Sequence, residues 1–331
     1  MTDAGNLGGK AGRTLLFVHG RDFKPAPDTL MDLAISAMQA GVERDYPEFA
    51  DDFNELDKRL AYYGDITGEF LIAQGRRYDE TLDLGDRRNA LIKLRSYERK
   101  KHFGISRYDR LPGKSALPEF AADVIVPVLG KLGLSKALIN RVGPDIAEYW
   151  NPDSDFASRI RERVRASICL ALDVGNDLMV LSHGTGCIVT YDVLWQLSHD
   201  PEYAEKYREK KIDVWLTAGA PLGDSMTAKR LFGADRSGVE RYPVNILSWH
   251  NLSAEDDFVS HDDTVADDFR PMMKQKQVSC IRDYKVYNLA VRYGKSNPHS
   301  SLGYLVHPRT AQIIVEWLQN SPGLTALTEH P

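Results

Sequence analysis

The sequence predicts an α/β fold with a doubly wound, mainly parallel sheet. Short, continuous apolar runs alternate with amphipathic helical patterns along most of the chain. Runs of this kind are typical of strands that are buried on both faces of a parallel sheet. The clearest unit is an apolar run at 178–181, then small and polar residues at 182–186, then a helical stripe at 188–197. Because ligands bind at the carboxyl ends of strands in such sheets, the turn at 182–186 is expected to carry chemistry.

Length and charge narrow the classes of protein. A chain of 331 residues with 43% hydrophobic residues can bury a substantial core, and its net charge of −5 argues against a general nucleic-acid binder. No apolar run approaches the roughly 18 residues of a membrane span, and the N-terminus lacks the apolar core of a secretory signal, so we expect a cytoplasmic protein. The three cysteines are too scattered for a disulfide framework and are interpreted as buried thiols: Cys169, Cys187 and Cys280.

The N-terminal part of the chain begins with a Gly-rich, polar stretch at 1–12, which we expect to be a disordered leader. The first strand is predicted at 14–18 (TLLFV). A helix with Asp28 as its N-cap follows, and a second strand is predicted at 56–63.

The strand–helix alternation stops between residues 66 and 150. Residues 87–110 carry nine Lys or Arg residues with aromatic residues between them, which we interpret as a solvated helical face rather than a nucleic-acid site. Residues 118–139 are more apolar but contain Pro and Gly. We predict that 66–150 is an inserted, largely helical cap, either a scaffold layer or a lid over a pocket.

The regular pattern resumes at Ser154, the expected N-cap of a helix that ends at Gly175. Further strands are predicted at 211–216, 244–249 and 284–291, and a closing helix at 309–318. The domain prediction is therefore a leader (1–12), a core (13–65 and 151–331) and the cap (66–150).

These units resemble the α/β-hydrolase fold family, especially its lipase and esterase-like branch. In that family a strand runs into a G-x-S-x-G turn that presents a serine nucleophile, and an acid and a histidine follow later in the chain. The loop His19-Gly20-Arg21 resembles the oxyanion-hole loop of the family, and TAGAPLG at 217–223 resembles the stretch that often follows its sixth strand.

The same resemblance implies which residues form the acid–histidine pair. Asp257 follows the penultimate strand and stands in the place of the acid, with Asp256 as the runner-up. His299 follows the last strand and stands in the place of the histidine. We expect Asp257 and His299 to hydrogen-bond.

The chain departs from the family at the centre of the motif. In LSHGTGC (181–187), Ser182 stands at the first glycine and Gly184 stands at the serine, so the nucleophile is missing. Glycine tolerates the strained turn, which costs other residues about 1–3 kcal/mol. Ser182 and Thr185 are the candidates for a substitute hydroxyl, while His183 is expected to pack beside the turn and Cys187 to point into the core.

Two functions remain open from the sequence. In the first, the chain has lost covalent catalysis and binds a small-molecule or lipid-like ligand under its cap, with a protein partner on the cap as a further expectation. In the second, it is an active ester hydrolase in which His299 and Asp257 activate water, or in which Ser182 replaces the serine. Whether the chain is an enzyme depends on this choice. No metal or other cofactor is expected, because the histidines lack zinc spacing.

Overall fold

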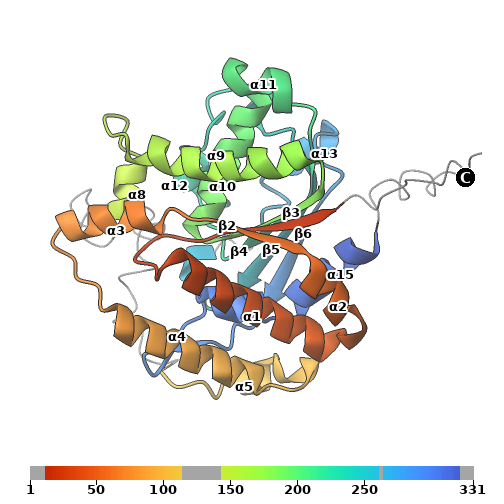
Figure 1. Cartoon of the computed structure of the whole chain (residues 1–331). Helices are drawn as coiled ribbons and strands as arrows, with labels where there is room; N and C mark the ends of the chain where they lie inside the picture. The colour runs from red at the N-terminus through yellow and green to blue at the C-terminus, as the bar shows by residue number, and fades with distance from the viewer. Residues whose placement is uncertain (1–11, 114–142, 261–263, 321–331) are drawn as a thin grey trace, which may run out of the picture.

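The molecule is built on a six-stranded parallel sheet between two layers of helices (Figure 1). The computed structural model describes residues 12–113, 143–260 and 264–320. The strand order is β2-β1-β3-β4-β5-β6, and each neighbouring pair runs parallel. The strands are β1 (Arg13–Val18), β2 (Asp57–Ala61), β3 (Asp177–His183), β4 (Ile212–Ala218), β5 (Ile246–Ala254) and β6 (Cys280–Val286). The predicted α/β class with a parallel sheet is confirmed.

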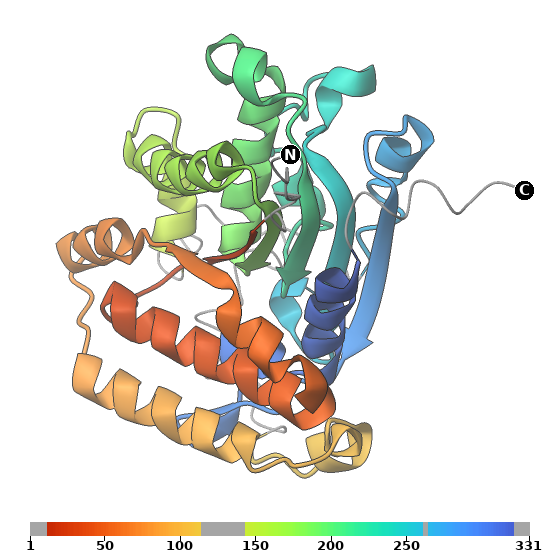
Figure 2. The same cartoon turned by 45° about the vertical axis from the view of Figure 1, so that its right-hand side comes forward.

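Helices cover both faces of the sheet, as the two views in Figures 1 and 2 show. On one face lie α9 (Phe156–Val174) and α10 (Thr185–His199), which pack against each other. On the other face lie α1 (Pro27–Asp45) and α15 (Pro308–Gln319), and α4 (Glu80–Arg95) packs on the outer side of α1. The sheet is therefore doubly wound.

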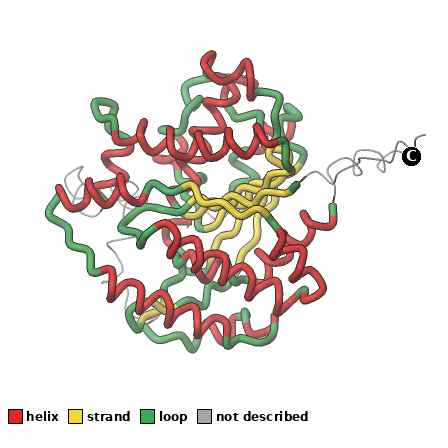
Figure 3. The backbone as a smooth tube through the Cα atoms, in the orientation of Figure 1, coloured by secondary structure: helices red, strands yellow, loops and turns green. Residues whose placement is uncertain are grey.

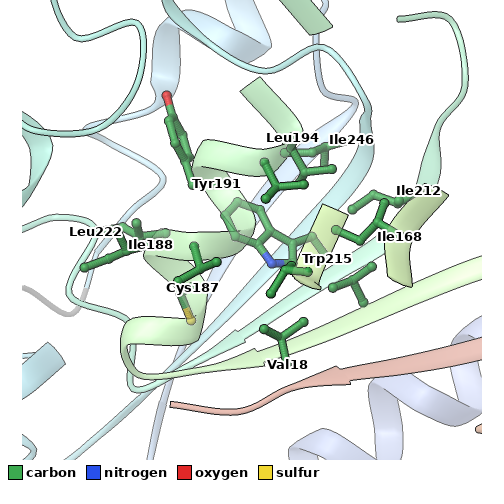
Figure 4. Packing of buried hydrophobic residues seen from close by; sticks show 14 of the residues in the cluster. Val18, Ile168, Cys187, Ile188, Tyr191, Leu194, Ile212, Trp215, Leu222 and Ile246 are labelled. Carbon is green, nitrogen blue, oxygen red and sulfur yellow. The ribbon is translucent and has the colours of Figure 1, made fainter. Parts of the chain in front are cut away.

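Alternate side chains of the central strands lie in two separate hydrophobic cores, one on each face of the sheet. Leu16 and Val18 of β1 belong to the cluster under α9 and α10, whereas Leu15 and Phe17 belong to the cluster under α1 and α15. Figure 4 shows the first cluster around Trp215, where Cys187 lies among apolar side chains as predicted. Burial of apolar surface stabilises the fold by about 25 cal/mol per Å². Because apolar side chains are buried on both faces, this burial fixes the register of these strands.

Shorter helices and strands lie between these elements, joined by the loops that Figure 3 draws in green. They are α2 (Ala50–Glu55), α3 (Gly64–Ala73), α5 (Ile105–Tyr108), α8 (Pro144–Tyr149), α11 (Pro201–Tyr207), α12 (Ser225–Ala228), α13 (Arg270–Lys274), α14 (Ser301–Leu305), β7 (Val291–Arg292) and β8 (Lys295–Ser296).

Four local predictions were wrong. Ser154 is not the N-cap of α9, because the helix starts at Phe156 with Asp155 as its N-cap. Asp28 lies in the first turn of α1 and makes no capping bond, because Ala26 is the N-cap and Pro27 opens the helix. The strand predicted to end at Trp249 continues to Ala254, where its ladder with β6 ends opposite Val286. The last strand of the sheet was predicted at 284–291, but β6 spans Cys280–Val286.

The predicted cap lies only partly within the described residues. Its residues 114–142 fall outside them, as does most of the predicted leader. In the described part, Leu91, Leu94 and Tyr97 join the core cluster of α1 and α15, so α4 forms an outer scaffold layer. The lid remains a prediction. Among the described helices, none is long and apolar enough to cross a membrane.

The winding of the sheet reverses between β1 and β3. The chain leaves β1 into α1 on one face, and it leaves the neighbouring β3 into α10 on the other face. Such a switch point opens a crevice at the carboxyl ends of the two strands, which is where ligands bind in open α/β sheets.

Candidate functional site

The turn between β3 and α10 is centred on Gly184. Its dihedral angles are φ 55° and ψ −126°, and its N–H donates to the carbonyl of Ala218 at 2.9 Å. A positive φ of this size favours glycine, because side chains at other residues clash with the backbone. A Cβ atom built on Gly184 would lie 3.0 Å from Nε2 of His299. The position that the resemblance assigns to a nucleophile therefore points at the histidine but carries no side chain.

The predicted contact between His299 and Asp257 is present. Nδ1 of His299 lies 3.1 Å from Oδ1 and 3.0 Å from Oδ2 of Asp257. Because a carboxylate accepts, Nδ1 carries the proton in this arrangement, and Nε2, which faces Gly184, is left as a free acceptor. The two side chains form an acid–histidine dyad at the carboxyl end of the sheet.

Asp257 is buried, and its other lone pairs are also occupied. The hydroxyl of Tyr304 donates to Oδ2 at 2.5 Å, and the N–H of Val259 donates to Oδ1 at 3.0 Å. Burial alone would raise the pKa of Asp257, but His299 and these two donors lower it below its usual value. The carboxylate is therefore held ionised beside the imidazole. The runner-up, Asp256, accepts from the hydroxyl of Tyr108 at 2.9 Å.

The loop that carries His299 is fixed by two asparagines. The N–H of His299 donates to Oδ1 of Asn297 at 3.1 Å. The buried Asn288 donates from Nδ2 to the carbonyls of Pro298 and Ser300, both at 2.8 Å. These bonds hold the backbone on either side of the histidine, so the ring position depends on residues outside the dyad.

His183 and Gly219 complete the surroundings of the imidazole. The ring of His183 lies 4.7 Å from the ring of His299, and its Nε2 lies 2.9 Å from the carbonyl of His299. Burial, and then the neighbouring His299, lower the pKa of His183 well below its usual value, so His183 is neutral. Gly219 follows the end of β4 with φ 59°, and a Cβ there would lie 3.0 Å from both Asp257 Oδ2 and His299 Nδ1.

Ser182 does not reach the histidine. Its side chain is fully buried, and Oγ lies 2.9 Å from Oγ1 of Thr190 and accepts from the indole N–H of Trp215 at 3.1 Å. The hydroxyl thus belongs to the packing between β3, β4 and α10, and this position gives no support to Ser182 as a replacement nucleophile. Thr185 opens α10 and lines a separate cavity of about 20 Å³.

The loop after β1 is fixed by buried polar contacts. His19 donates from Nδ1 to the carbonyl of Gly20 at 2.7 Å, and its Nε2 accepts from the N–H of Tyr63 at 3.1 Å. Burial, followed by the charge of Lys24, lowers the pKa of His19 to about 3. His19 is therefore a neutral residue that ties the end of β1 to the end of β2.

Arg21, the third residue of the predicted oxyanion loop, is engaged in a tight ion pair. Its Nε lies 2.9 Å from Oδ1 and 3.1 Å from Oδ2 of Asp145, and Nη2 lies 2.6 Å from Oδ1. A bidentate pair of this kind has well-defined geometry. Arg21 holds the loop to α8.

A cavity of about 120 Å³ opens between this loop and the dyad. Several side chains that the sequence did not single out line it together with His299, namely Lys24, Arg87 and Arg292. Tyr304 and Asn288 were also missed. The only sequence signal was the Asp83/Arg87 spacing of four residues, which predicts an ion pair on a helix but not its place beside His299.

The comparisons with known proteins give no match: no protein-family model, no curated protein and no solved structure matches this chain. Within the described ranges, no group of three or more His, Cys, Asp or Glu residues is arranged to hold a metal ion. The function of the site is therefore inferred from its own geometry.

Proposed function

We propose that this chain is an α/β-hydrolase-like protein, related to serine esterases and lipases, that has lost its nucleophile and binds a small ligand beside His299. The observation that carries the proposal is the glycine at the turn. The Cβ direction of Gly184 points at Nε2 of His299 at 3.0 Å, as a nucleophile would, and glycine supplies no hydroxyl there. In this proposal the protein is cytoplasmic, and residues 66–150 cover the ligand.

Covalent catalysis through a substitute residue has little support. The hydroxyl of Ser182 is already hydrogen-bonded in the core, and the thiol of Cys187 donates to the carbonyl of Ser182 at 3.3 Å. Burial raises the pKa of this thiol, which disfavours the thiolate. Loss of a triad nucleophile leaves only residual acceleration from the remaining groups, so binding is the function that the site supports best.

One observation favours a second candidate, hydrolysis by activated water. Nδ1 of His299 faces a buried carboxylate, which leaves Nε2 as an acceptor, and His299 lines the open space of the cavity of about 120 Å³. A water molecule or a ligand hydroxyl in that space could give its proton to Nε2. General-base catalysis of this kind contributes typically about 10²- to 10⁴-fold, enough for slow hydrolysis of an activated ester.

Gly184→Ser tests the assignment of the elbow. In the proposed arrangement, wild-type protein stays unlabelled by a fluorophosphonate probe, and Gly184→Ser becomes labelled because its hydroxyl reaches His299. Gly184→Ala is the matched control, since it brings the same backbone strain and the same Cβ contact without an oxygen. Labelling of the wild type, or a folded Gly184→Ser protein that stays unlabelled, would contradict the proposal.

Turnover of short p-nitrophenyl esters separates the two candidates. If the dyad activates water, wild-type protein hydrolyses these esters, and His299→Ala loses about 10²-fold or more of the rate. If the site only binds, both proteins show the same background rate. Asn320→Ala, at the end of α15 and away from the dyad, is the control for nonspecific effects of substitution.

A further inference from the structure

The cavity beside His299 is lined by more cations than carboxylates. Its charged side chains are four cations, Arg21, Lys24, Arg87 and Arg292, and one carboxylate, Asp22. They come from three separate parts of the chain, namely the loop after β1, helix α4 and strand β7. Since Arg21 is occupied by Asp145, the cations to consider are the other three.

Two carboxylates hold the arginines: Asp83 contacts both of them, and Asp86 accepts from Nε of Arg292. Asp83 accepts from Nε of Arg87 through Oδ2 at 2.6 Å and from Nη2 of Arg292 through Oδ1 at 2.7 Å. The hydroxyls of Tyr78 and Tyr293 also donate to it, at 2.9 and 3.2 Å. Burial would raise the pKa of Asp83, but the arginines lower it, so it stays ionised and fixes both guanidinium groups.

The arginines keep unused donors. Within the described residues, the Nη atoms of Arg87 and Nη1 of Arg292 have no hydrogen-bond partner. These nitrogens are not fully buried. The side chains of Arg87 and Arg292 are nevertheless only 11% and 9% exposed. Guanidinium donors that are this well buried require an acceptor, which water or a ligand in the cavity can supply.

Lys24 adds charge without a carboxylate partner. Its Nζ donates to carbonyls of its own loop, including those of Asp22 at 3.3 Å and Phe23 at 3.2 Å. No described carboxylate lies within ion-pair distance of it. Burial and then the charge of Arg87 lower the pKa of Lys24 to about 8, as expected where positive charge is incompletely balanced.

We propose that this cavity binds an anionic oxygen group of a small ligand, a carboxylate or a phosphate, through Arg87 and Arg292. Planar guanidinium groups match both kinds of anion, and a fixed pair of them presents several parallel donors. His299 lines the same cavity of about 120 Å³, so a small ligand held by the arginines also reaches the dyad. This inference rests on the proposed function, because it names the chemical class of the ligand.

The test measures binding of simple anions to the full-length protein by calorimetry and by thermal shift. Inorganic phosphate and malonate are titrated at constant ionic strength, with sodium chloride as the balancing salt. We expect at least one of the two anions to bind and to raise the melting temperature. Phosphate alone identifies a phosphate-bearing ligand, and malonate alone identifies a carboxylate-bearing one.

Variants show whether the anion binds in this cavity. Arg87→Gln should weaken binding about 10- to 100-fold, the loss expected for a charge-assisted pair of hydrogen bonds. Arg87→Lys, which keeps the charge without the planar fork, should give an intermediate loss. Arg163→Gln is the control, because Arg163 also forms an ion pair, at 2.9 Å with Asp65, but on the exposed surface. Circular dichroism verifies that each variant is folded.

The outcomes separate this inference from the proposed function. Binding that Arg87→Gln abolishes and Arg163→Gln preserves supports the inference. If neither anion binds, or if Arg87→Gln binds as tightly as wild type, the anionic class is wrong. Titration of neutral ethyl butyrate then tests the proposed function. If ethyl butyrate binds, and if this binding is lost in Ser301→Trp, a substitution at another residue that lines the cavity, the proposed function stands. Absence of that binding too would count against both.

Discussion

The two halves of the site are built in opposite ways. At the ends of β1 and β3 lie glycines and neutral histidines: Gly20, Gly184, His19 and His183. At the ends of β5 and β6 lies a buried carboxylate, Asp257, with Tyr304, Val259 and His299 bound to it. We call these the elbow half and the acid half.

The contrast between the two halves shows that an acid–histidine pair can be held together without a nucleophile. Each oxygen of Asp257 has partners that do not involve residue 184, so the acid half is stable by its own hydrogen bonds. The geometry of Gly184, in contrast, is only directed at His299 and makes no side-chain bond to it. The four predictions that follow test how independent the two halves are.

Acid should weaken the fold through its buried neutral histidines before it affects Asp257, and this is the largest expected effect. Burial lowers the pKa of His19 and His307 to about 3 and that of His250 to about 4. Such histidines stabilise the fold fully above their unfolded pKa of about 6.5, and this stability is lost as the pH falls toward the folded values. The three together should cost about 4 kcal/mol at pH 5.5, and His183 acts in the same direction.

Asp257 behaves differently, because its folded pKa is lowered. The stability that Asp257 contributes is fully present above its unfolded pKa of about 3.8. This stability is lost only as the pH falls through the lower pKa of the folded state. Urea unfolding at pH 7.5, 6.5 and 5.5 measures the effect. His19→Gln should reduce the slope of the free energy of unfolding against pH by the equivalent of about one proton. A free energy of unfolding that does not change over this pH range would contradict the prediction.

Tyr304→Phe should damage the acid half alone. The hydroxyl of Tyr304 donates to Asp257 and accepts from the N–H of Ala254 at 2.9 Å, so its loss leaves two buried groups without a partner. We expect a loss of about 2–3 kcal/mol in the free energy of unfolding. Tyr62→Phe, which removes a half-buried hydroxyl bonded to the carbonyl of Pro25 at 3.1 Å, should cost less than about 1 kcal/mol. Equal losses would contradict the prediction.

Gly184→Ala should strain the elbow half by about 1–3 kcal/mol. The cost has two sources, the positive φ and the contact of the new Cβ with His299 Nε2. Gly175→Ala isolates the first source, because Gly175 has φ 74° and nothing within 4 Å of the added Cβ. Chemical denaturation of both variants gives the difference, and a Gly175 variant as unstable as the Gly184 variant would mean that the histidine contact costs nothing.

Ser182→Ala should have the smallest effect, about 1 kcal/mol, because it removes hydrogen bonds to Thr190 and Trp215 in an otherwise unchanged core. Anion binding and any esterase activity should remain at the wild-type level. The measurement is urea unfolding combined with both assays, and Ser167→Ala on the exposed side of α9 is the control. Loss of activity in Ser182→Ala alone would restore Ser182 as a nucleophile.

The sequence predicted those features that depend on local patterns. The strand, turn and helix at 177–199 follow from a buried apolar run, a positive-φ glycine and a helical stripe, and each is encoded within a few residues. The pairing of Asp257 with His299 was expected from the family resemblance, together with the order of the two loops after the last predicted strands.

The remaining features depend on packing over long distances. Asp83 and Arg292 are 209 residues apart in the sequence and meet only because α4 packs beside β7. Likewise, the end of β6 is set by the length of its ladder with β5, while the residues after Val286 keep an apolar pattern that reads as a continued strand. Neither feature leaves a periodic signal in the sequence.

Gly219 lies where a small added side chain would disturb the contact between Asp257 and His299. Its Cα faces the gap between Asp257 and His299, and a single methyl group there would lie 3.0 Å from an atom of each. Gly219→Ala would therefore act as a wedge that separates the acid from the imidazole while both residues keep their own chemistry. A Cβ on Gly184 would likewise lie 3.0 Å from Nε2 of the same ring, so the smallest side chain at either glycine can shift the orientation of the histidine.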